Sequence, residues 1–182
     1  MSLKDNHNDI DRGQFTDPIF FSKKHIFLLV ALLVIAFFAF KFLNKQMLVI
    51  TPINIAGEKI IIPVEDGLWH LNYIHSVQKT VVDECFRVRE DNTFSMYRTR
   101  YSSFGVGLPF LPGEGELTFL PNDTLQLDLN NPRIFPVVKL WTGIEAKVNL
   151  VIGKNILPIY EKYPSGTLVQ ISTCKRYQAY SQ

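Results

Sequence analysis

Three residues of one predicted hairpin have side chains suited to acid–base or nucleophilic chemistry: His75, Ser76 and Glu84. The segment 68–77 alternates apolar and polar residues, which predicts a strand with His75 on the apolar face and Ser76 on the other. Neighbouring residues of a strand point to opposite faces, so His75 and Ser76 cannot act as base and nucleophile unless a bulge intervenes. We therefore expect no enzyme activity and no catalytic residue.

Glu84 is predicted on the apolar face of the second strand of this hairpin, over residues 81–89. The simplest register places His75 opposite Val82 and Tyr73 opposite Glu84, which makes His75 and Glu84 diagonal neighbours. A buried carboxylate needs a partner or a raised pKa. The candidate partners are His75, Tyr73, Arg98 and Arg100. A structural polar pair, a contact with a ligand or partner, and catalysis stay open as interpretations of His75 and Glu84.

A glycine-containing loop, Ser103 to Pro109, follows the predicted strand 93–102. Two glycines two positions apart permit a turn in which backbone N–H groups converge on an anion. No strand–loop–helix pattern surrounds them, so a phosphate-binding loop is weakly supported, and a structured loop with positive φ is the simpler interpretation. The candidate contact residues of the loop are Phe104, Gly105, Gly107 and Pro109.

The composition excludes several kinds of site. Cys85 and Cys174 are too few for a disulfide framework or a cysteine zinc site, although they could form one bridge in an oxidising compartment. The sequence leaves open whether they pair. With 19 Lys and Arg against 17 Asp and Glu, the chain has a net charge of +2 and no basic stripe, which argues against nucleic acid as a partner. No pattern indicates a metal site or a cofactor.

These candidate residues lie in a domain that follows an apolar run, Ile26 to Leu43. Eighteen helical residues span roughly 27 Å, close to the thickness of the hydrocarbon core of a bilayer. We predict a polar tail over residues 1–24, a transmembrane helix over 25–44 and an extracytoplasmic domain over 47–182. A buried core helix and a removed signal peptide are the alternatives, but the run lacks a small-residue cleavage site. Lysines flank both ends of the run, so charge does not set its orientation.

After residue 47, short apolar or alternating segments are separated by Gly, Pro, Asn and Asp. This spacing predicts an all-β domain, an antiparallel β-sandwich or a barrel-like domain. The predicted strands are 47–54, 59–64, 68–77, 81–89, 93–102, 116–120, 124–129, 137–141, 146–152, 156–160 and 167–177.

Two blocks of the sequence resemble the signature of a bacterial family of small, uncharacterised proteins. The first is Tyr73-Ile74-His75-Ser76-Val77 with Thr80, Val82 and Glu84, and the second is Ser103-Phe104-Gly105-Val106-Gly107-Leu108-Pro109. Genes of that family lie beside TAXI-type TRAP transporters, secondary importers that use an extracytoplasmic binding protein. Val106 departs from the small residue expected at its position, and the resemblance assigns no role to His75, Glu84 or Gly105.

The resemblance implies a membrane-anchored small subunit of a TAXI-type TRAP transporter that imports organic acids such as dicarboxylates. The implied partners are the large TRAP membrane protein, the periplasmic substrate-binding protein and the lipid bilayer. The implied location is the bacterial inner membrane, with the N-terminus in the cytoplasm and the β domain in the periplasm. The alternative function is a membrane-tethered periplasmic module that binds a small ligand.

Overall fold

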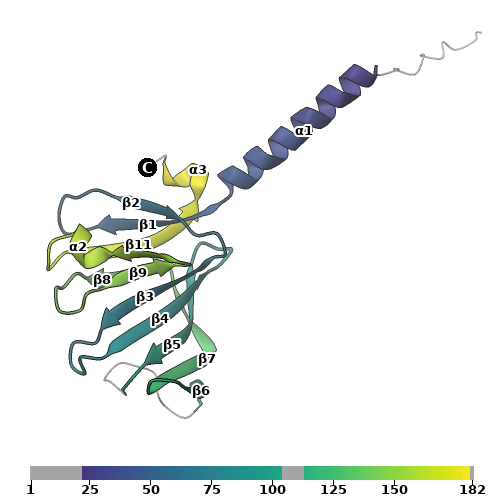
Figure 1. Ribbon diagram of the computed structural model, residues 1–182. Coiled ribbons are helices and arrows are strands. Elements are labelled where there is room, and N and C mark those ends of the chain that lie inside the picture. Colours follow the sequence, from purple (N-terminus) through teal and green to yellow (C-terminus); the bar gives the residue numbers. More distant parts are fainter. Residues whose placement is uncertain (1–21, 104–112, 181–182) are drawn as a thin grey trace, which may run out of the picture. The chain divides into compact units, whose positions relative to one another are not determined.

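Two antiparallel sheets form the domain, as seen in a computed structural model that describes residues 22–103 and 113–180 (Figure 1). The four-stranded sheet has the order β2-β1-β11-β8 and consists of β1 (Gln46–Pro52), β2 (Ile60–Pro63), β8 (Val138–Trp141) and β11 (Leu168–Lys175). The seven-stranded sheet has the order β10-β9-β3-β4-β5-β7-β6. Its strands are β3 (Leu68–Ile74), β4 (Val81–Val88), β5 (Phe94–Tyr101), β6 (Gly115–Leu120), β7 (Thr124–Phe135), β9 (Asn149–Ile152) and β10 (Asn155–Pro158). The predicted fold class is confirmed.

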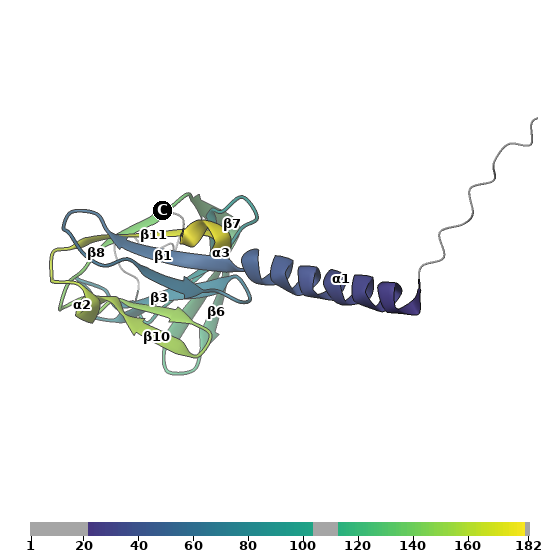
Figure 2. The same ribbon diagram turned by 90° about the horizontal axis from the view of Figure 1, so that it is seen from above.

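Figure 2 shows the strands of the domain from above. The core lies between the two sheets, because alternate residues of each strand point inward. From β3 and β4, the ring of Trp69 stacks on Phe86 with centroids 4.4 Å apart, and Phe94 of β5 meets Trp69 edge-on at 5.0 Å. The four-stranded sheet contributes fully buried apolar side chains from β1 and β11: Leu48, Ile50, Val169 and Ile171. Burying a side chain of this size stabilises the fold by about 1.5–3 kcal/mol.

Each of the eleven segments predicted as strands contains one, but two of them end in short helices. The predicted strand 156–160 ends at Pro158 and continues as helix α2 (Ile159–Lys162). The predicted strand 167–177 ends at Lys175 and continues as helix α3 (Arg176–Ala179). A helix of four residues is barely one turn, so it leaves no helical period in the sequence.

Strand β7 continues beyond its predicted end at Leu129, through a segment that we predicted as a break. The pairing of β5 with β7 shifts register between Met96, which pairs with Arg133, and Arg98, which pairs with Asp128. Pro132 lies within this irregular stretch, where a missing backbone N–H is tolerated. The turn signal Asn130-Asn131-Pro132 therefore marks an irregularity within a strand and not its end.

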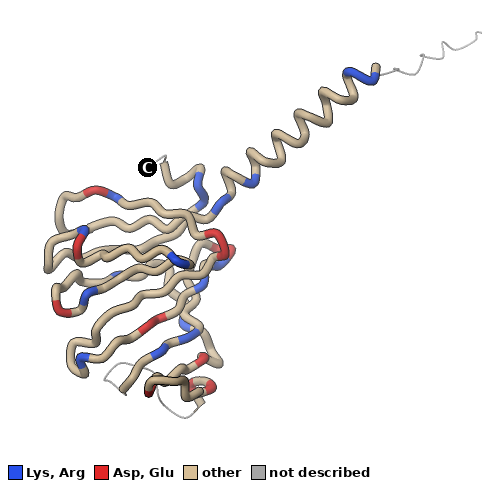
Figure 3. Tube along the Cα trace, viewed as in Figure 1, with Lys and Arg blue, Asp and Glu red and all other residues tan. Residues whose placement is uncertain are grey.

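Helix α1 (Lys23–Leu43) is long and apolar enough to cross a membrane. Its only charged residues are Lys23 and Lys24 at its start and Lys41 in its last turn (Figure 3). None of its residues is buried. The helix begins two residues before the predicted span of 25–44, and only Asn44 and Lys45 connect it to β1.

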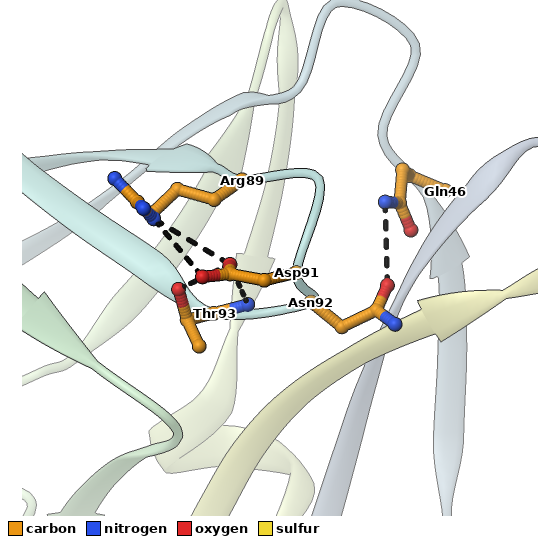
Figure 4. Close-up of polar contacts among 5 residues, drawn as sticks. All are labelled: Gln46, Arg89, Asp91, Asn92 and Thr93. Atoms are coloured by element: carbon orange, nitrogen blue, oxygen red, sulfur yellow. Dashed lines mark hydrogen bonds and ion pairs between the residues drawn. The ribbon is translucent and has the colours of Figure 1, made fainter.

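The turn between β4 and β5 lies beside the first residue of β1 (Figure 4). The carboxylate of Asp91 accepts hydrogen bonds from the backbone N–H of Thr93 at 3.1 Å and its hydroxyl at 2.6 Å, and Arg89 pairs with it at 3.4 Å. Asn92 adopts a positive φ of 58°, a conformation that asparagine tolerates. The side-chain amide of Gln46 lies 3.4 Å from Oδ1 of Asn92, so this turn lies beside the start of β1. With its nitrogen and oxygen interchanged, the same amide donates to the carbonyl of Cys174 and accepts from Nζ of Lys175, both at 3.1 Å.

Candidate functional site

The β3–β4 hairpin has the predicted faces but a register shifted by two residues. Tyr73 pairs with Val82 and Leu71 with Glu84, so the predicted pairs of Tyr73 with Glu84 and of His75 with Val82 are wrong. A shift of two residues returns every side chain to its original face, because side chains alternate with a period of two. Glu84 therefore stays on the inner face of the sheet, and its diagonal neighbour is Tyr73 and not His75.

Glu84 is hydrogen-bonded to a neutral partner. The hydroxyl of Tyr73 donates to Oε1 of Glu84 at 3.2 Å. Burial raises the pKa of Glu84, while the Tyr73 hydrogen bond and the charge of Arg133 partly oppose that rise. Burial and the nearby Glu84 carboxylate also raise the pKa of Tyr73. On β5, Thr99 pairs with Glu84, and its buried hydroxyl has no hydrogen-bond partner among the described residues.

Two of the four candidate partners of Glu84 lie on the other face of the sheet. Nε of Arg98 donates to Oδ1 of Asp128 at 2.5 Å, and Nε of Arg100 donates to Oε1 of Gln126 at 2.8 Å. Both arginines thus belong to the polar outer face, and Tyr73 is the candidate that the structure confirms as the partner of Glu84.

His75 begins the turn that connects β3 with β4. Its backbone N–H donates to the carbonyl of Thr80 at 2.8 Å, and its Nδ1 accepts from the backbone N–H groups of Val77 and Gln78 at 3.3 and 3.2 Å. An Nδ1 that accepts hydrogen bonds places the proton of the neutral ring on Nε2. These hydrogen bonds to Nδ1 orient the imidazole within the turn and stabilise the turn itself.

A cleft of about 370 Å³ lies next to this hairpin, between the inner face of β3 and strand β8. Tyr73, His75, Ser76 and Glu84 line it together, so the structure brings three predicted site residues into one cavity. Ser76 reaches the cleft because β3 ends at Ile74, so the predicted alternation does not extend to Ser76. The remaining lining residues are largely apolar: Leu71, Ile74, Val138, Lys139, Leu140, Trp141, Ala146 and Val148.

Sequence reasoning missed the β8 side of the cleft. Val138 and Leu140 lie more than fifty residues from Glu84 in the chain, and β8 reaches the cleft through its pairing with β11. No sequence signal points to it, because the exposure of Trp141 at the end of β8 is known only from the structure.

The predicted loop residues Phe104, Gly105, Gly107 and Pro109 lie outside the described part of the chain. The described residue before them, Ser103, donates from its hydroxyl to Oε1 of Gln78 at 3.3 Å. Gln78 belongs to the β3–β4 turn, so the start of the second sequence block lies beside the first block.

The two cysteines are free thiols on different sheets. Cys85 lies on the outer face of β4, with Arg98 and Arg100 near it, whereas Cys174 packs beside Met47 and Val49 on β1. Burial raises the pKa of both thiols. Because a disulfide requires Cα atoms within about 7 Å, two cysteines on the outer faces of opposite sheets cannot pair in this fold, and the possible bridge is not formed.

Acidic, histidine and cysteine side chains form no cluster of three or more that could hold a metal ion within residues 22–103 and 113–180. The carboxylates of the outer face are held instead by arginine and amide groups. Asp128 accepts from Arg98 and also from Nε2 of Gln126 at 2.9 Å, and Asp83 accepts from Nδ2 of Asn72 at 2.9 Å.

The comparisons with known proteins give one match. A family model described as a domain of unknown function, DUF1850, matches residues 70–159. No curated protein and no solved structure matches the chain. The matched region runs from β3 to the start of α2, so it contains the hairpin, the glycine loop and every residue that lines the cleft. The chain thus carries a DUF1850 domain between residues 70 and 159, with the candidate site inside it.

Proposed function

We propose that this protein is a membrane-anchored small subunit of a TAXI-type TRAP transporter that imports organic acids such as dicarboxylates. The observation that carries the proposal is the joining of one apolar helix, through only Asn44 and Lys45, to a β domain that contains the DUF1850 match. A single helix cannot enclose a translocation path, so such a protein acts through a partner. The resemblance of the two sequence blocks names that partner as the large TRAP membrane protein.

The two parts of the chain suit two different contacts. In α1, the small residues Ala31, Ala36 and Ala39 allow a neighbouring membrane helix to approach closely. In the domain, the cleft beside Glu84 and the exposed Trp141 supply a surface for the periplasmic substrate-binding protein. The protein would then lie in the bacterial inner membrane with its N-terminus in the cytoplasm and its β domain in the periplasm.

Co-purification tests this proposal. The full chain carries a C-terminal tag, native membranes are dissolved in a mild detergent, and the proteins that stay bound are identified. We expect the large TRAP membrane protein in near-stoichiometric amount. A Glu84→Ala variant should lower recovery of the substrate-binding protein, whereas Asp128→Ala on the outer face serves as the matched control. Recovery of the folded chain alone would contradict the proposal.

A second candidate function is a tethered module that binds a small ligand, and the cleft favours it. Its volume of about 370 Å³, its largely apolar walls and the polar groups of Glu84, Tyr73 and His75 are typical of small-molecule sites. The test is a thermal-shift screen of the purified full chain with small organic acids and amines. A ligand that stabilises the wild type but not Glu84→Ala would support this function, and no stabilisation by any compound would count against it.

A further inference from the structure

A groove outside the DUF1850 match lies between the last turn of α1 and helix α3. It has a volume of about 590 Å³ and is lined by Phe42, Leu43, Arg176, Tyr177 and Tyr180. All five residues belong to the compact unit that begins at Ala39 and includes the β domain. The groove therefore lies where the apolar helix gives way to the folded domain.

Arg176 lines this groove and contacts the end of α1. Its guanidinium lies over the ring of Phe42, 4.0 Å from the centroid, and its backbone N–H donates to the carbonyl of Lys45 at 2.9 Å. Its buried Nε has no hydrogen-bond partner in the described part of the chain. A guanidinium also carries two terminal amino groups in a planar arrangement that is suited to a phosphate group.

Helix α3 turns two tyrosines outward beside Arg176. Ala179 is buried against Met47 and Val49, whereas Tyr177 and Tyr180 are 53% and 68% exposed. The side-chain oxygen of Gln178 accepts from the backbone N–H of Lys175 at 3.0 Å and closes the start of the helix. Tyrosine is enriched at the boundary between hydrocarbon and headgroups, because its ring is apolar and its hydroxyl is polar.

The charge around the groove is positive. Lys41 precedes Phe42, and Lys175 precedes Arg176, so the chain near both walls is basic (Figure 3). Lys45 is paired with Glu65 at 2.6 Å, and no acidic residue lines the groove among the described residues. Basic side chains near a bilayer surface attract anionic lipids.

We propose that this groove binds the headgroup of an anionic phospholipid from the membrane in which α1 is anchored. The phosphate accepts hydrogen bonds from Arg176, the hydroxyls of Tyr177 and Tyr180 lie among the headgroups, and the acyl chain lies against Phe42 and Leu43. The site rests on the membrane anchor of the proposed function, but it requires neither the transporter nor the cleft at Glu84.

Native mass spectrometry of the detergent-purified full chain tests the site. The protein is mixed with equal amounts of phosphatidylglycerol and phosphatidylcholine, and the ratio of bound lipids is measured. We expect the wild type to retain phosphatidylglycerol in preference, and Arg176→Gln to lower the ratio on the order of tenfold, since it removes a charge-assisted contact. Equal retention of both lipids by the wild type would overturn the proposal.

Arg89→Gln is the matched control, because it removes the same charge from the β4–β5 turn, beside Gln46 at the start of the domain (Figure 4). It should leave the lipid ratio unchanged; an equal loss in both variants would show diffuse charge attraction and overturn the specific site. Thermal unfolding checks that Arg176→Gln is folded. If Arg176→Gln is not folded, the double variant Tyr177→Ser with Tyr180→Ser tests the site instead. Both side chains are exposed, so their replacement should leave the domain folded. An unchanged ratio in that double variant also overturns the proposal.

The same mass spectrum tests the lipid site and the membrane anchor of the proposed function separately. Its intact mass shows whether the segment before β1 is retained. Loss of that segment would remove the anchor and with it both proposals. An intact chain without a preference for phosphatidylglycerol would remove only the lipid site.

Discussion

The two faces of the seven-stranded sheet hold their carboxylates in opposite ways. On the inner face, Glu84 accepts a hydrogen bond from the neutral phenol of Tyr73, and burial raises its pKa. On the outer face, burial would also raise the pKa of Asp128, but hydrogen bonds from Arg98 and Gln126 outweigh it, so the pKa lies below its ordinary value. The charge of Asp128 is therefore favoured in the folded protein, and that of Glu84 is disfavoured.

This difference separates a structural polar group from a candidate functional one. The Asp128 network stabilises the sheet at neutral pH by an ordinary ion pair on a half-exposed surface. Glu84 costs stability when charged and lies on the wall of the cleft. A buried acid with a raised pKa beside a cavity is typical of binding sites.

The largest expected contrast is between Phe86 and Arg87, which are neighbours on opposite faces. Phe86→Ala should lower the free energy of unfolding by about 3–5 kcal/mol, because it removes a buried ring stacked on Trp69. Arg87→Ala should cost less than about 1 kcal/mol, since the exposed Arg87 only lies over the ring of Tyr97. Urea denaturation measures both values. Equal losses would show that the assigned faces are wrong.

Removing the Tyr73 hydroxyl, which donates a hydrogen bond to Glu84, should have the next largest effect on stability. Tyr73→Phe should destabilise the domain by about 1–3 kcal/mol at pH values where Glu84 is ionised, because it leaves a buried carboxylate without its described donor. The loss should shrink near pH 4, where the carboxyl is protonated. Tyr97→Phe on β5 is the control, with an expected change within about 0.5 kcal/mol. A loss of stability that does not depend on pH would show that the Tyr73 hydroxyl does not stabilise the charged form of Glu84.

The pH dependence of stability should differ in sign between the two faces. A carboxyl with a raised pKa stabilises the fold at low pH and loses that contribution as pH rises above its ordinary value of 4.5, so Glu84→Gln should abolish a decline in stability above that pH. The lowered pKa of Asp128 gives stability that is lost as pH falls below 3.8.

At pH 7, Asp128→Asn should therefore destabilise the domain by about 0.5–1 kcal/mol, and Glu84→Gln should not destabilise it. Thermal unfolding of the two variants from pH 3 to pH 8 provides the comparison. Parallel pH profiles would refute the contrast between the faces.

Ser76→Ala should have the smallest effect, within about 0.5 kcal/mol, because Ser76 is exposed in the turn. The measurement is again urea denaturation, combined with the co-purification assay. A large loss of partner binding without loss of stability would instead show that Ser76 contacts the partner.

The strands could be predicted because each one alternates apolar and polar residues or is bounded by turn residues. The register of the β3–β4 hairpin could not, because the turn places Lys79 at a positive φ of 55°, which a lysine does not signal. Both registers keep Glu84 on the inner face, so its face was predicted correctly although its partner was assigned only as one of four candidates. Strand β8 was predicted, but its place beside the cleft depends on pairing with a distant strand.

The short connection of Asn44 and Lys45 has a consequence for affinity. Two residues span at most about 7 Å, so under the proposed function the first strand of the domain would start close to the bilayer that holds α1. Under the proposed function, a membrane partner in the same bilayer would meet it by lateral diffusion at a high effective concentration. The domain can then use contacts that would be too weak between freely diffusing proteins, and each contact can break and form again without the partners separating.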